Sequence, residues 1–371
     1  MRARAEARTG DATDLGFLDE GSVDLVVTSP PYPMIEMWDE AFGRQRPGAA
    51  EALAAGDGAG AFEMMHELLD ATWAEVHRVL RPGGIACINI GDATRTLNGD
   101  FRLWSNHSRV LSGLVRAGFV LLPDILWRKP NNAPNKFLGS GMLPAGAYVT
   151  YEHEYVLIAR KGPRREFATE EERSRRRESA FFWEERTLWF SDVWLDIPGA
   201  GQELVDEASR KRSAAFPFEL AYRLVCMHSV KGDTVLDPFA GTGITAAAAL
   251  ASGRNAVSVE LDPALLPVAR NLLLSLPEFA NRHLRQRLRR HLEFVERRTA
   301  EGGAFKHVNR NYGFPVVTSQ ERDLLLNDLL SVAGDDSMAA RYGDQPQPEF
   351  VRDQPSGPVR TPTGRSPAPS R

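Results

Sequence analysis

Residues 29–32, Ser-Pro-Pro-Tyr, place a hydroxyl group, two prolines and an aromatic ring at the end of an apolar run. The run, residues 23–29, has the composition of a buried strand, and prolines often end strands, so a strand followed by a simple turn is one interpretation. The other is a rigid clamp. Because prolines fix the backbone angles, the Ser29 hydroxyl, the Pro30 carbonyl and the Tyr32 ring could hold a flat substrate between them. The motif alone leaves both interpretations open.

A second motif, residues 235–243, has the spacing of a nucleoside-binding turn. An apolar strand leads into a turn where Gly241 and Gly243 carry no side chain, so that the backbone can approach a ligand closely. A predicted helix follows at once and directs its first N–H groups at the ligand. The next predicted strand ends at Glu260, whose carboxylate can accept both hydroxyls of a ribose. A nucleoside-containing cofactor is therefore expected. Ala246, where a dinucleotide fingerprint would have its third glycine, leaves a dinucleotide open.

The remaining elements alternate between strands and helices, which predicts an α/β fold with parallel neighbours. Expected strands are 23–29, 85–92, 120–129, 152–161, 233–243 and 255–262; expected helices are 61–80, 108–119, 216–230, 244–253 and 263–274. Three stretches do not join this alternation. Residues 33–60 are rich in glycine and alanine and are predicted to form a mobile surface loop, residues 162–212 are charged and aromatic, and the chain from about 345 is predicted to be disordered.

Bulk composition excludes several classes of protein. The 371 residues are 43% hydrophobic and 25% charged, no apolar run reaches the roughly 20 residues of a membrane span, and the first residues lack a signal peptide. Cys87 and Cys226 form neither a disulfide framework nor a zinc signature, and the eight histidines show no ligand spacing, so no metal is expected. We expect an intracellular, cytoplasmic protein with no membrane partner.

The net charge of −4 argues against a protein that coats nucleic acid, but basic residues cluster in two stretches, 159–177 and 281–298. Such clusters suit a surface that follows phosphates, and a solvated helix face is an equal alternative. Arg285 and Arg289, in the second stretch, are candidate DNA contacts.

The two motifs, in this order within one α/β chain, resemble the S-adenosylmethionine-dependent DNA amino-methyltransferases of the N4-cytosine and N6-adenine type. Ser-Pro-Pro-Tyr comes first and Phe-x-Gly-x-Gly last, which is similar to the permuted β arrangement of that family. The resemblance covers roughly residues 10–161 and 213–272. It implies a Rossmann-like fold, with a twisted, mostly parallel sheet flanked by helices, plus a smaller DNA-recognition region. Five parts are expected: a catalytic half (1–161), a target-recognition insertion (162–212), a cofactor-binding half (213–275), a basic helical region (276–344) and a disordered tail (345–371).

By the resemblance, Ser29, Pro30, Pro31 and Tyr32 grip a target base flipped out of duplex DNA. Tyr32 would stack on the base, and the Ser29 hydroxyl and Pro30 carbonyl would accept hydrogen bonds from the exocyclic amine. Serine at the first position is typical of cytosine-N4 enzymes, whereas Asp or Asn is typical of adenine-N6 enzymes. A cytosine-N4 methyltransferase is therefore the first hypothesis. An adenine-N6 enzyme of the same fold is the alternative, and an inactive DNA-binding subunit of a restriction complex is more distant.

The resemblance also assigns a cofactor pocket for S-adenosylmethionine. Glu260 would hold the ribose, and Asp11 would face the adenine amine. The residues assigned to the pocket are Asp11, Phe216, Pro217, Asp237, Phe239, Gly241, Gly243 and Glu260. Asp92 could line the pocket or cap a strand end.

Double-stranded DNA is the expected partner, and a cognate restriction endonuclease is left open. Trp38 could close over the base or fold back onto the core, and Lys129 could meet a phosphate or be ordinary surface. Because residues 162–212 are few for reading several base pairs, the C-terminal part is expected to share the recognition. Trp183, Trp189 and Trp194 are predicted to build a small core, and a role in reading DNA is the alternative. The implied setting is a prokaryotic cytoplasm, at the nucleoid.

Overall fold

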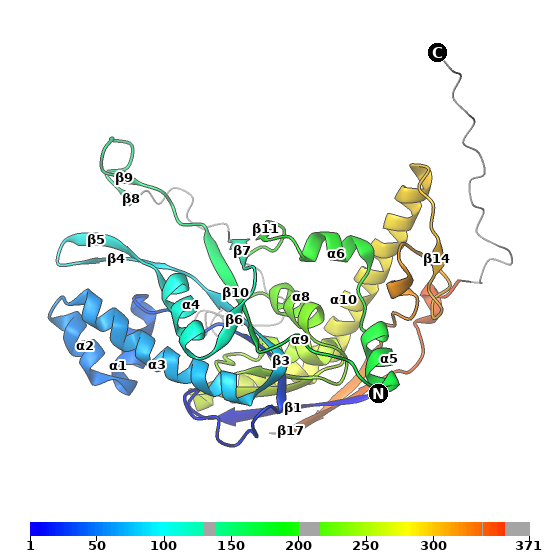
Figure 1. Cartoon of the computed structure of the whole chain (residues 1–371), viewed down its shortest axis with the longest axis horizontal. Helices are drawn as coiled ribbons and strands as arrows, with labels where there is room; N and C mark the ends of the chain where they lie inside the picture. Colours follow the sequence, from blue (N-terminus) through cyan, green and yellow to red (C-terminus); the bar gives the residue numbers. More distant parts are fainter. Residues whose placement is uncertain (130–137, 200–215, 336, 353–371) are drawn as a thin grey trace, which may run out of the picture.

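The computed structural model describes residues 1–129, 138–199, 216–335 and 337–352. Five parallel strands form the centre of its large sheet, in the order β3-β2-β12-β13-β1 (Figure 1). Their bounds are β1 Arg2–Thr9, β2 Val23–Thr28, β3 Leu80–Ile90, β12 Thr234–Asp237 and β13 Asn255–Glu260. The two strands from late in the sequence, β12 and β13, thus lie between the first two strands of the chain.

Helices cover both faces of this centre. Helices α3 (Gly58–Val79) and α4 (Asn106–Arg116) pack on one face, and α8 (Phe218–His228), α9 (Ile244–Ala251) and α10 (Leu266–Ala300) pack on the other. In β2, Val26 belongs to the first core, whereas Leu25 and Val27 belong to the second. This burial on both faces explains the continuous apolar run before Ser29, because side chains of a strand alternate between faces. The α/β prediction is confirmed.

Antiparallel strands extend the sheet beyond β3. Strand β10 (His153–Lys161) pairs with β3, β6 (Phe119–Leu121) and β7 (Ile125–Arg128), and β11 (Val193–Trp194) runs parallel to β7. Strand β11 comes from the predicted insertion, and Trp189 and Trp194 are buried in the main core, whereas Trp183 is 38% exposed. A small separate core for the three tryptophans is therefore wrong. Residues 162–199 instead join the central fold, with helices α5 (Glu170–Glu178) and α6 (Trp183–Trp189).

On the other side of the sheet, β17 (Ser337–Tyr342) pairs antiparallel with β1, and β16 (Leu329–Gly334) pairs with β17. The prediction that 276–344 is helical is therefore wrong after Ala300, where α10 ends. Helix α10 also runs without a break through the expected boundary at 275/276. Strands β14 (His307–Val308) and β15 (Pro315–Val316) form a small hairpin over a core of Leu284, Leu288, Tyr312 and Phe314. Short 3-10 helices are η2 (Pro263–Leu265), η3 (Ser319–Glu321) and η4 (Pro348–Phe350).

Two further predictions are corrected. Residues 33–60 are not a loop but contain η1 (Glu36–Trp38), α1 (Asp39–Gln45), α2 (Pro47–Ala54) and the start of α3. Phe42 and Ala49 are buried against α3, and alanine is the best helix former, so the composition suits these short helices. The tail expected to be disordered from 345 is ordered at least through η4, where Phe350 is 4% exposed. Residues 353–371 lie outside the described part.

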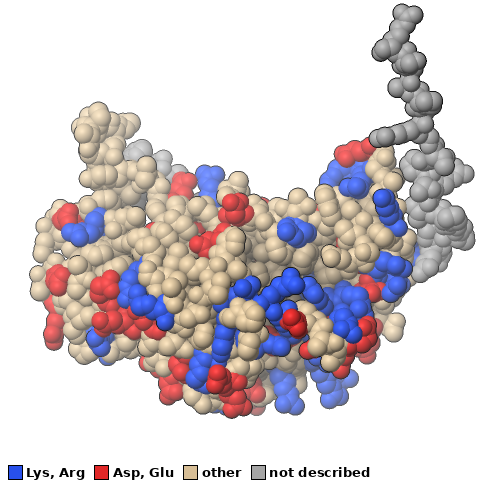
Figure 2. Space-filling view, viewed as in Figure 1, with Lys and Arg blue, Asp and Glu red and all other residues tan. Residues whose placement is uncertain are grey.

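Two hairpins project from the molecule beside the sheet, β4–β5 (Ala93–Leu97 and Asp100–Trp104) and β8–β9 (Leu138–Gly139 and Ala147–Tyr148) (Figure 1). In the same orientation, Figure 2 shows a hollowed upper edge between the uncharged β8–β9 projection and the far end of α10, where Lys and Arg gather. No helix in the described ranges combines the length and the apolar composition needed to cross a bilayer.

Candidate active site

The two sequence motifs meet at the carboxyl ends of β2 and β12, which are neighbours in the sheet. Strand β2 leads through α3 to β3 on one side, whereas β12 leads through α9 to β13 on the other. The connections diverge here, and a crevice at such a point is the usual ligand site of an open α/β sheet. A cleft of about 720 Å³ opens at this place, within the size range of small-molecule sites.

Most residues predicted from the sequence line this cleft. They are Asp11, Ser29, Pro30, Pro31, Tyr32, Trp38, Lys129, Phe216, Asp237, Phe239, Gly241 and Glu260. Gly243 and Pro217 are not part of the lining. Gly243 is the N-cap of α9 with φ 83°, and a Cβ there would lie 2.9 Å from the Cβ of Ala269, so this glycine lets α9 and α10 approach each other. Pro217 is the N-cap of α8.

Asp237 joins the two motifs. Its carboxylate accepts hydrogen bonds from Thr28 Oγ1 at the end of β2 (2.6 Å), from Thr245 Oγ1 on α9 (2.7 Å) and from Phe239 N in the turn (3.1 Å). Burial raises the pKa of Asp237 to about 6, and the three hydrogen bonds oppose that rise. The carboxylate therefore fixes the end of β2 relative to the glycine turn.

Tyr32 is held by its hydroxyl. The hydroxyl donates to Glu154 Oε2 (3.0 Å), lies 3.1 Å from Ser29 Oγ and accepts from Asn89 Nδ2 (2.8 Å), which also donates to Glu154 (2.7 Å). Burial, reinforced by the charge of Glu154, raises the pKa of Tyr32 well above its ordinary value, so the phenol is a neutral donor. The network fixes the ring beside the serine.

Glu154 and Asn89 were missed by the sequence interpretation. Both lie on the antiparallel pair β10–β3, and the Glu154 carboxylate also pairs with Lys129 Nζ at 2.8 Å. Asn89 is a polar side chain inside an otherwise apolar strand, residues 85–90, and that exception was the available signal. Lys129 thus reaches the cleft, but as the partner of a carboxylate.

The cofactor side of the cleft is built around Glu260. Its carboxylate accepts from the backbone N–H groups of Gly241 (2.7 Å) and Asp262 (2.9 Å), and burial raises its pKa. Asp11 accepts from Thr13 N and Oγ1 and, across the cleft, from Gln45 Nε2 of α1 at 3.1 Å. The segment predicted to be a mobile loop is therefore a wall of the site. Trp38 lies in that wall, with its ring partly packed on the small core under α1 and α2.

Three other candidates lie outside the lining. Asp92 accepts hydrogen bonds from His107 N and Nδ1 at the start of α4. It therefore caps this helix and does not line the cleft. Arg285 pairs with Asp328 and Glu349, at 2.9 and 2.8 Å. It thereby links α10 to residues 319–352, the C-terminal segment. Arg289 is exposed on the same helix. DNA contact by either arginine stays a prediction. Across the described ranges, no three His, Cys, Asp or Glu side chains come together as metal ligands.

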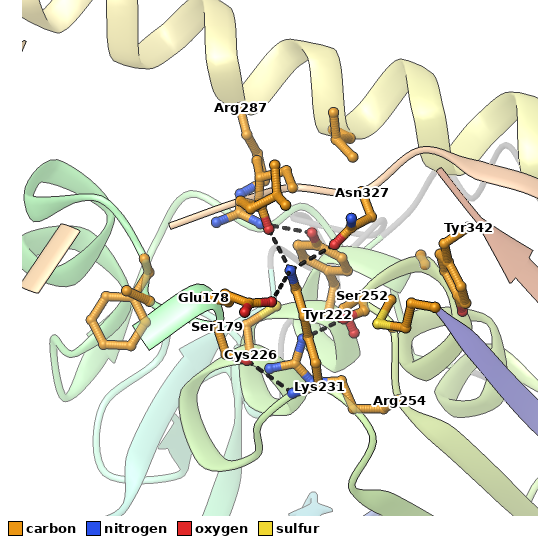
Figure 3. Close-up of a pocket in the computed structure, with 18 residues that line it drawn as sticks. Glu178, Ser179, Tyr222, Cys226, Lys231, Ser252, Arg254, Arg287, Asn327 and Tyr342 are labelled. Carbon is orange, nitrogen blue, oxygen red and sulfur yellow. Dashed lines mark hydrogen bonds and ion pairs between the residues drawn. The ribbon is translucent and has the colours of Figure 1, made fainter. Parts of the chain in front are cut away.

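A much smaller cavity, about 20 Å³, lies between α8, α10 and the C-terminal segment (Figure 3). Lys231 reaches through it and donates from Nζ to Leu325 O and Asn327 Oδ1, both at 2.6 Å. Beside it, the buried Arg254 donates to Ser229 O and Oγ. The volume holds about one water molecule.

Comparisons with known proteins found a matching family model and several relatives. A family model described as DNA methylase matches residues 23–271. The chain is 48% identical to the Type II methyltransferase M.MthZI of Methanothermobacter thermautotrophicus, over 85% of this chain and 88% of that protein. It is 47% identical to M.MjaI of Methanocaldococcus jannaschii, over 70% of this chain and 88% of that one.

Among solved structures, the putative DNA modification methylase TTHA0409 of Thermus thermophilus, in complex with S-adenosyl-L-methionine, superposes with a TM-score of 0.58 at 33% identity, over 74% of this chain and 95% of the other. The PvuII DNA methyltransferase, which is cytosine-N4-specific, shares the fold with a TM-score of 0.50 at 18% identity, over 76% and 92%.

Proposed function

The chain belongs to the DNA methylase family, and from that membership we propose that it methylates the exocyclic N4 amine of a flipped cytosine in duplex DNA. S-adenosylmethionine is the cofactor. When bound, it supplies the methyl group from its sulfonium centre and leaves as a neutral thioether. The observation that carries the choice of base is Ser29, which stands beside Tyr32 in the cleft wall.

The cleft residues fit a nucleoside cofactor. Glu260 presents a carboxylate that its own turn already orients, and a carboxylate there can accept from ribose hydroxyls. Phe239 adds an aromatic side chain, and Gly241 leaves space where a side chain would stand. Asp11, two residues after the end of β1, which pairs with β13 at Glu260, provides an acceptor for an adenine amine. The volume of about 720 Å³ leaves room for a second, flat group.

That second group is the target base. The Tyr32 ring offers a stacking surface that is held at its hydroxyl end, and stacking of a base on an aromatic side chain contributes about 1–3 kcal/mol. The Ser29 hydroxyl and the Pro30 carbonyl accept hydrogen bonds from the amine and thereby orient its lone pair. Serine is a poor base, so its role is orientation, and the rate comes mainly from positioning.

The proposed biological role is modification of a specific DNA site within a Type II system. The relatives M.MthZI and M.MjaI, at 48% and 47% identity, carry that designation. We extend it to this chain, with duplex DNA as substrate and a cognate endonuclease as functional partner. Such a role places the protein at the nucleoid of a prokaryotic cell.

The test is direct. Pure protein is incubated with unmethylated bacterial DNA and S-adenosylmethionine, and the DNA is digested to nucleosides for mass spectrometry. N4-methylcytosine is expected, and Ser29→Ala should reduce its yield because the amine loses an acceptor. N6-methyladenine would keep the enzyme class but show that adenine, and not cytosine, is the target base. Absence of any methylated nucleoside, with cofactor binding measurable, would contradict the proposal.

A further inference from the structure

The β8–β9 hairpin and the residue after it, residues 138–149, expose large apolar side chains, two of them in the tip at residues 140–146. Met142 is 87% exposed, Leu143 70% and Val149 85%. Single exposed apolar residues are ordinary on a protein surface, but several on one projecting hairpin mark an interaction site.

The hairpin rises from the wall of the cleft. Strands β7 and β10 pair up to Arg128 and His153, and Lys129 N donates to Glu152 O at 2.8 Å as the two strands leave the sheet. Lys129 and Glu154 line the cleft, and Glu154 holds the Tyr32 hydroxyl. The apolar tip therefore extends from the strand pair that carries Glu154, the residue that holds the Tyr32 hydroxyl.

Contacts with neighbouring elements brace the hairpin. The Tyr148 ring stacks on Phe101 of the β4–β5 hairpin, with ring centroids 5.0 Å apart and planes 15° apart. Tyr151 donates its hydroxyl to Asp92 at 3.0 Å, and Asp92 also accepts from His107. A braced projection loses less conformational freedom on binding than a free loop does.

The charges favour DNA as the occupant. Between Lys129 and Tyr151 the sequence holds no Asp or Glu. At the base of the hairpin, Arg128 and Lys129 pair with Glu152 and Glu154, so the acidic groups there are neutralised. Figure 2 shows this uncharged projection at one end of the hollowed edge and Lys and Arg, beside Asp and Glu, at the other end. On the tip itself nothing acidic opposes a phosphate backbone. Proteins that kink DNA from the minor groove frequently insert Leu, Met or Phe between base steps and partly unstack them.

We propose that Met142 and Leu143 at this tip enter the DNA duplex and occupy the space that the flipped target base leaves. The proposal rests on the proposed function, because it needs a base drawn into the cleft beside Tyr32. Leaving the stack costs a base a few kcal/mol, and apolar side chains in the gap offset part of that cost by restoring contact with the neighbouring bases.

Contact of the tip with DNA is tested by thiol protection. The natural cysteines, Cys87 and Cys226, are both buried, so Met142→Cys introduces a single accessible thiol. Excess unmethylated bacterial DNA with S-adenosylhomocysteine should slow its maleimide labelling about tenfold or more. The matched variant Ala333→Cys, exposed on β16 at the opposite edge of the sheet, should label at an unchanged rate.

Unchanged labelling of the Met142→Cys thiol in the presence of DNA overturns the proposal. Protection that rises with protein concentration in the absence of DNA overturns it too, because a second copy of the chain would then cover the tip. Formation of a methylated nucleoside by the unmodified protein is measured in parallel. If the wild-type protein methylates DNA while the thiol stays accessible, only the role of the tip is refuted. If the thiol is protected but no methylated nucleoside forms, the proposed function is refuted, and insertion at a flipped base falls with it although the tip contacts DNA.

Insertion itself is tested on oligonucleotides that carry the site methylated in the bacterial DNA. The double variant Met142→Ser/Leu143→Ser should methylate the fully paired duplex about tenfold more slowly than wild type, the rate equivalent of roughly 1.4 kcal/mol. On a duplex whose target base faces an abasic position, the two proteins should differ less than threefold. Leu143→Met, which keeps an apolar side chain, should behave as wild type. Equal losses of methylation rate on both duplexes would overturn the insertion of Met142 and Leu143.

Discussion

The cleft at the ends of β2 and β12 and the Lys231 cavity both hold buried ionisable groups, yet they differ in the open volume beside those groups. Around Lys231, the ammonium group donates to oxygens of the C-terminal segment, and a volume of about 20 Å³ remains. In the cleft, Glu260 and Ser29 face a volume of about 720 Å³. Burial lowers the pKa of Lys231 to about 8 and raises that of Asp237 to about 6, so a shifted pKa occurs in both places. Open volume next to polar atoms, rather than the shift, distinguishes the binding site from the structural one.

The largest effect that this comparison predicts is on the cleft side, at Tyr32. Tyr32→Ala removes the stacking surface and should reduce methyl transfer at least about 100-fold, since stacking contributes up to about 3 kcal/mol and positioning is lost with it. Binding of S-adenosylmethionine, measured by calorimetry, should be unchanged. Tyr32→Phe, which keeps the ring and loses the bond to Glu154, should show a smaller loss. Undiminished turnover by Tyr32→Ala would refute the clamp.

Glu260→Ala should act on the cofactor instead of the base. The variant loses a charged acceptor, and a hydrogen bond to a charged group contributes about 1.5–3 kcal/mol, so the Kd for S-adenosylmethionine should rise roughly 10- to 100-fold. Glu260→Gln, which keeps the size of the side chain, should lie between. If calorimetry gives the wild-type Kd for Glu260→Ala, the ribose role is wrong.

On the other side of the comparison, Lys231→Met should affect stability and leave catalysis alone. The carbonyl of Leu325 and the amide oxygen of Asn327 lose their donor, and an unsatisfied buried polar group costs about 1–3 kcal/mol. Urea unfolding should reveal the loss, with exposed Lys306→Met as the control that stays within about 0.5 kcal/mol of wild type. Slower methyl transfer at unchanged stability would erase the distinction between the two regions.

The smallest effect is a pH dependence at Asp237. Because its pKa is raised from 3.8 to about 6, the folded protein binds more protons at this group than the unfolded chain does between these values. Its contribution to the free energy of unfolding is therefore full below about pH 4 and is lost as the pH rises through 6. The stability of wild type relative to Asp237→Asn should fall between pH 5 and pH 7. If the stability difference stays constant, or grows, over this range, Asp237 does not have the raised pKa.

The cleft residues that could be predicted from the sequence are those at the ends of strands. Ser29 follows the apolar strand β2, and Asp237 is the last residue of β12. Parallel strands bring their carboxyl ends to one edge, so the meeting of the two motifs follows from general rules. Glu154 was not predictable in the same way. It enters the cleft because β10 runs antiparallel to β3, and the orientation of a strand is decided by its partners and not by its own residues.

Helices around residues 39–54 were missed because glycine and alanine together suggested a loop. Pro47 at the start of α2 and the alanines after it were the overlooked signal, since proline suits the first helical position. The C-terminal strand β17 was missed although its burial alternates strictly between exposed and buried residues. Its partner β1 lies at the other end of the sequence, and a short strand depends on such pairing.

The position of β12 and β13 between β2 and β1 has a consequence for biosynthesis. Ala5 on β1 pairs with Ala256 on β13, so the first strand that leaves the ribosome has no parallel neighbour until about 250 further residues exist. At roughly 5–20 residues per second, that wait lasts about 10–50 s. During it, β1 and the edge of β2 that later pairs with β12 keep unpaired N–H and C=O groups, open to chaperones or to other nascent chains. The permuted gene order thus delays completion of the parallel centre of the sheet until most of the protein has been translated.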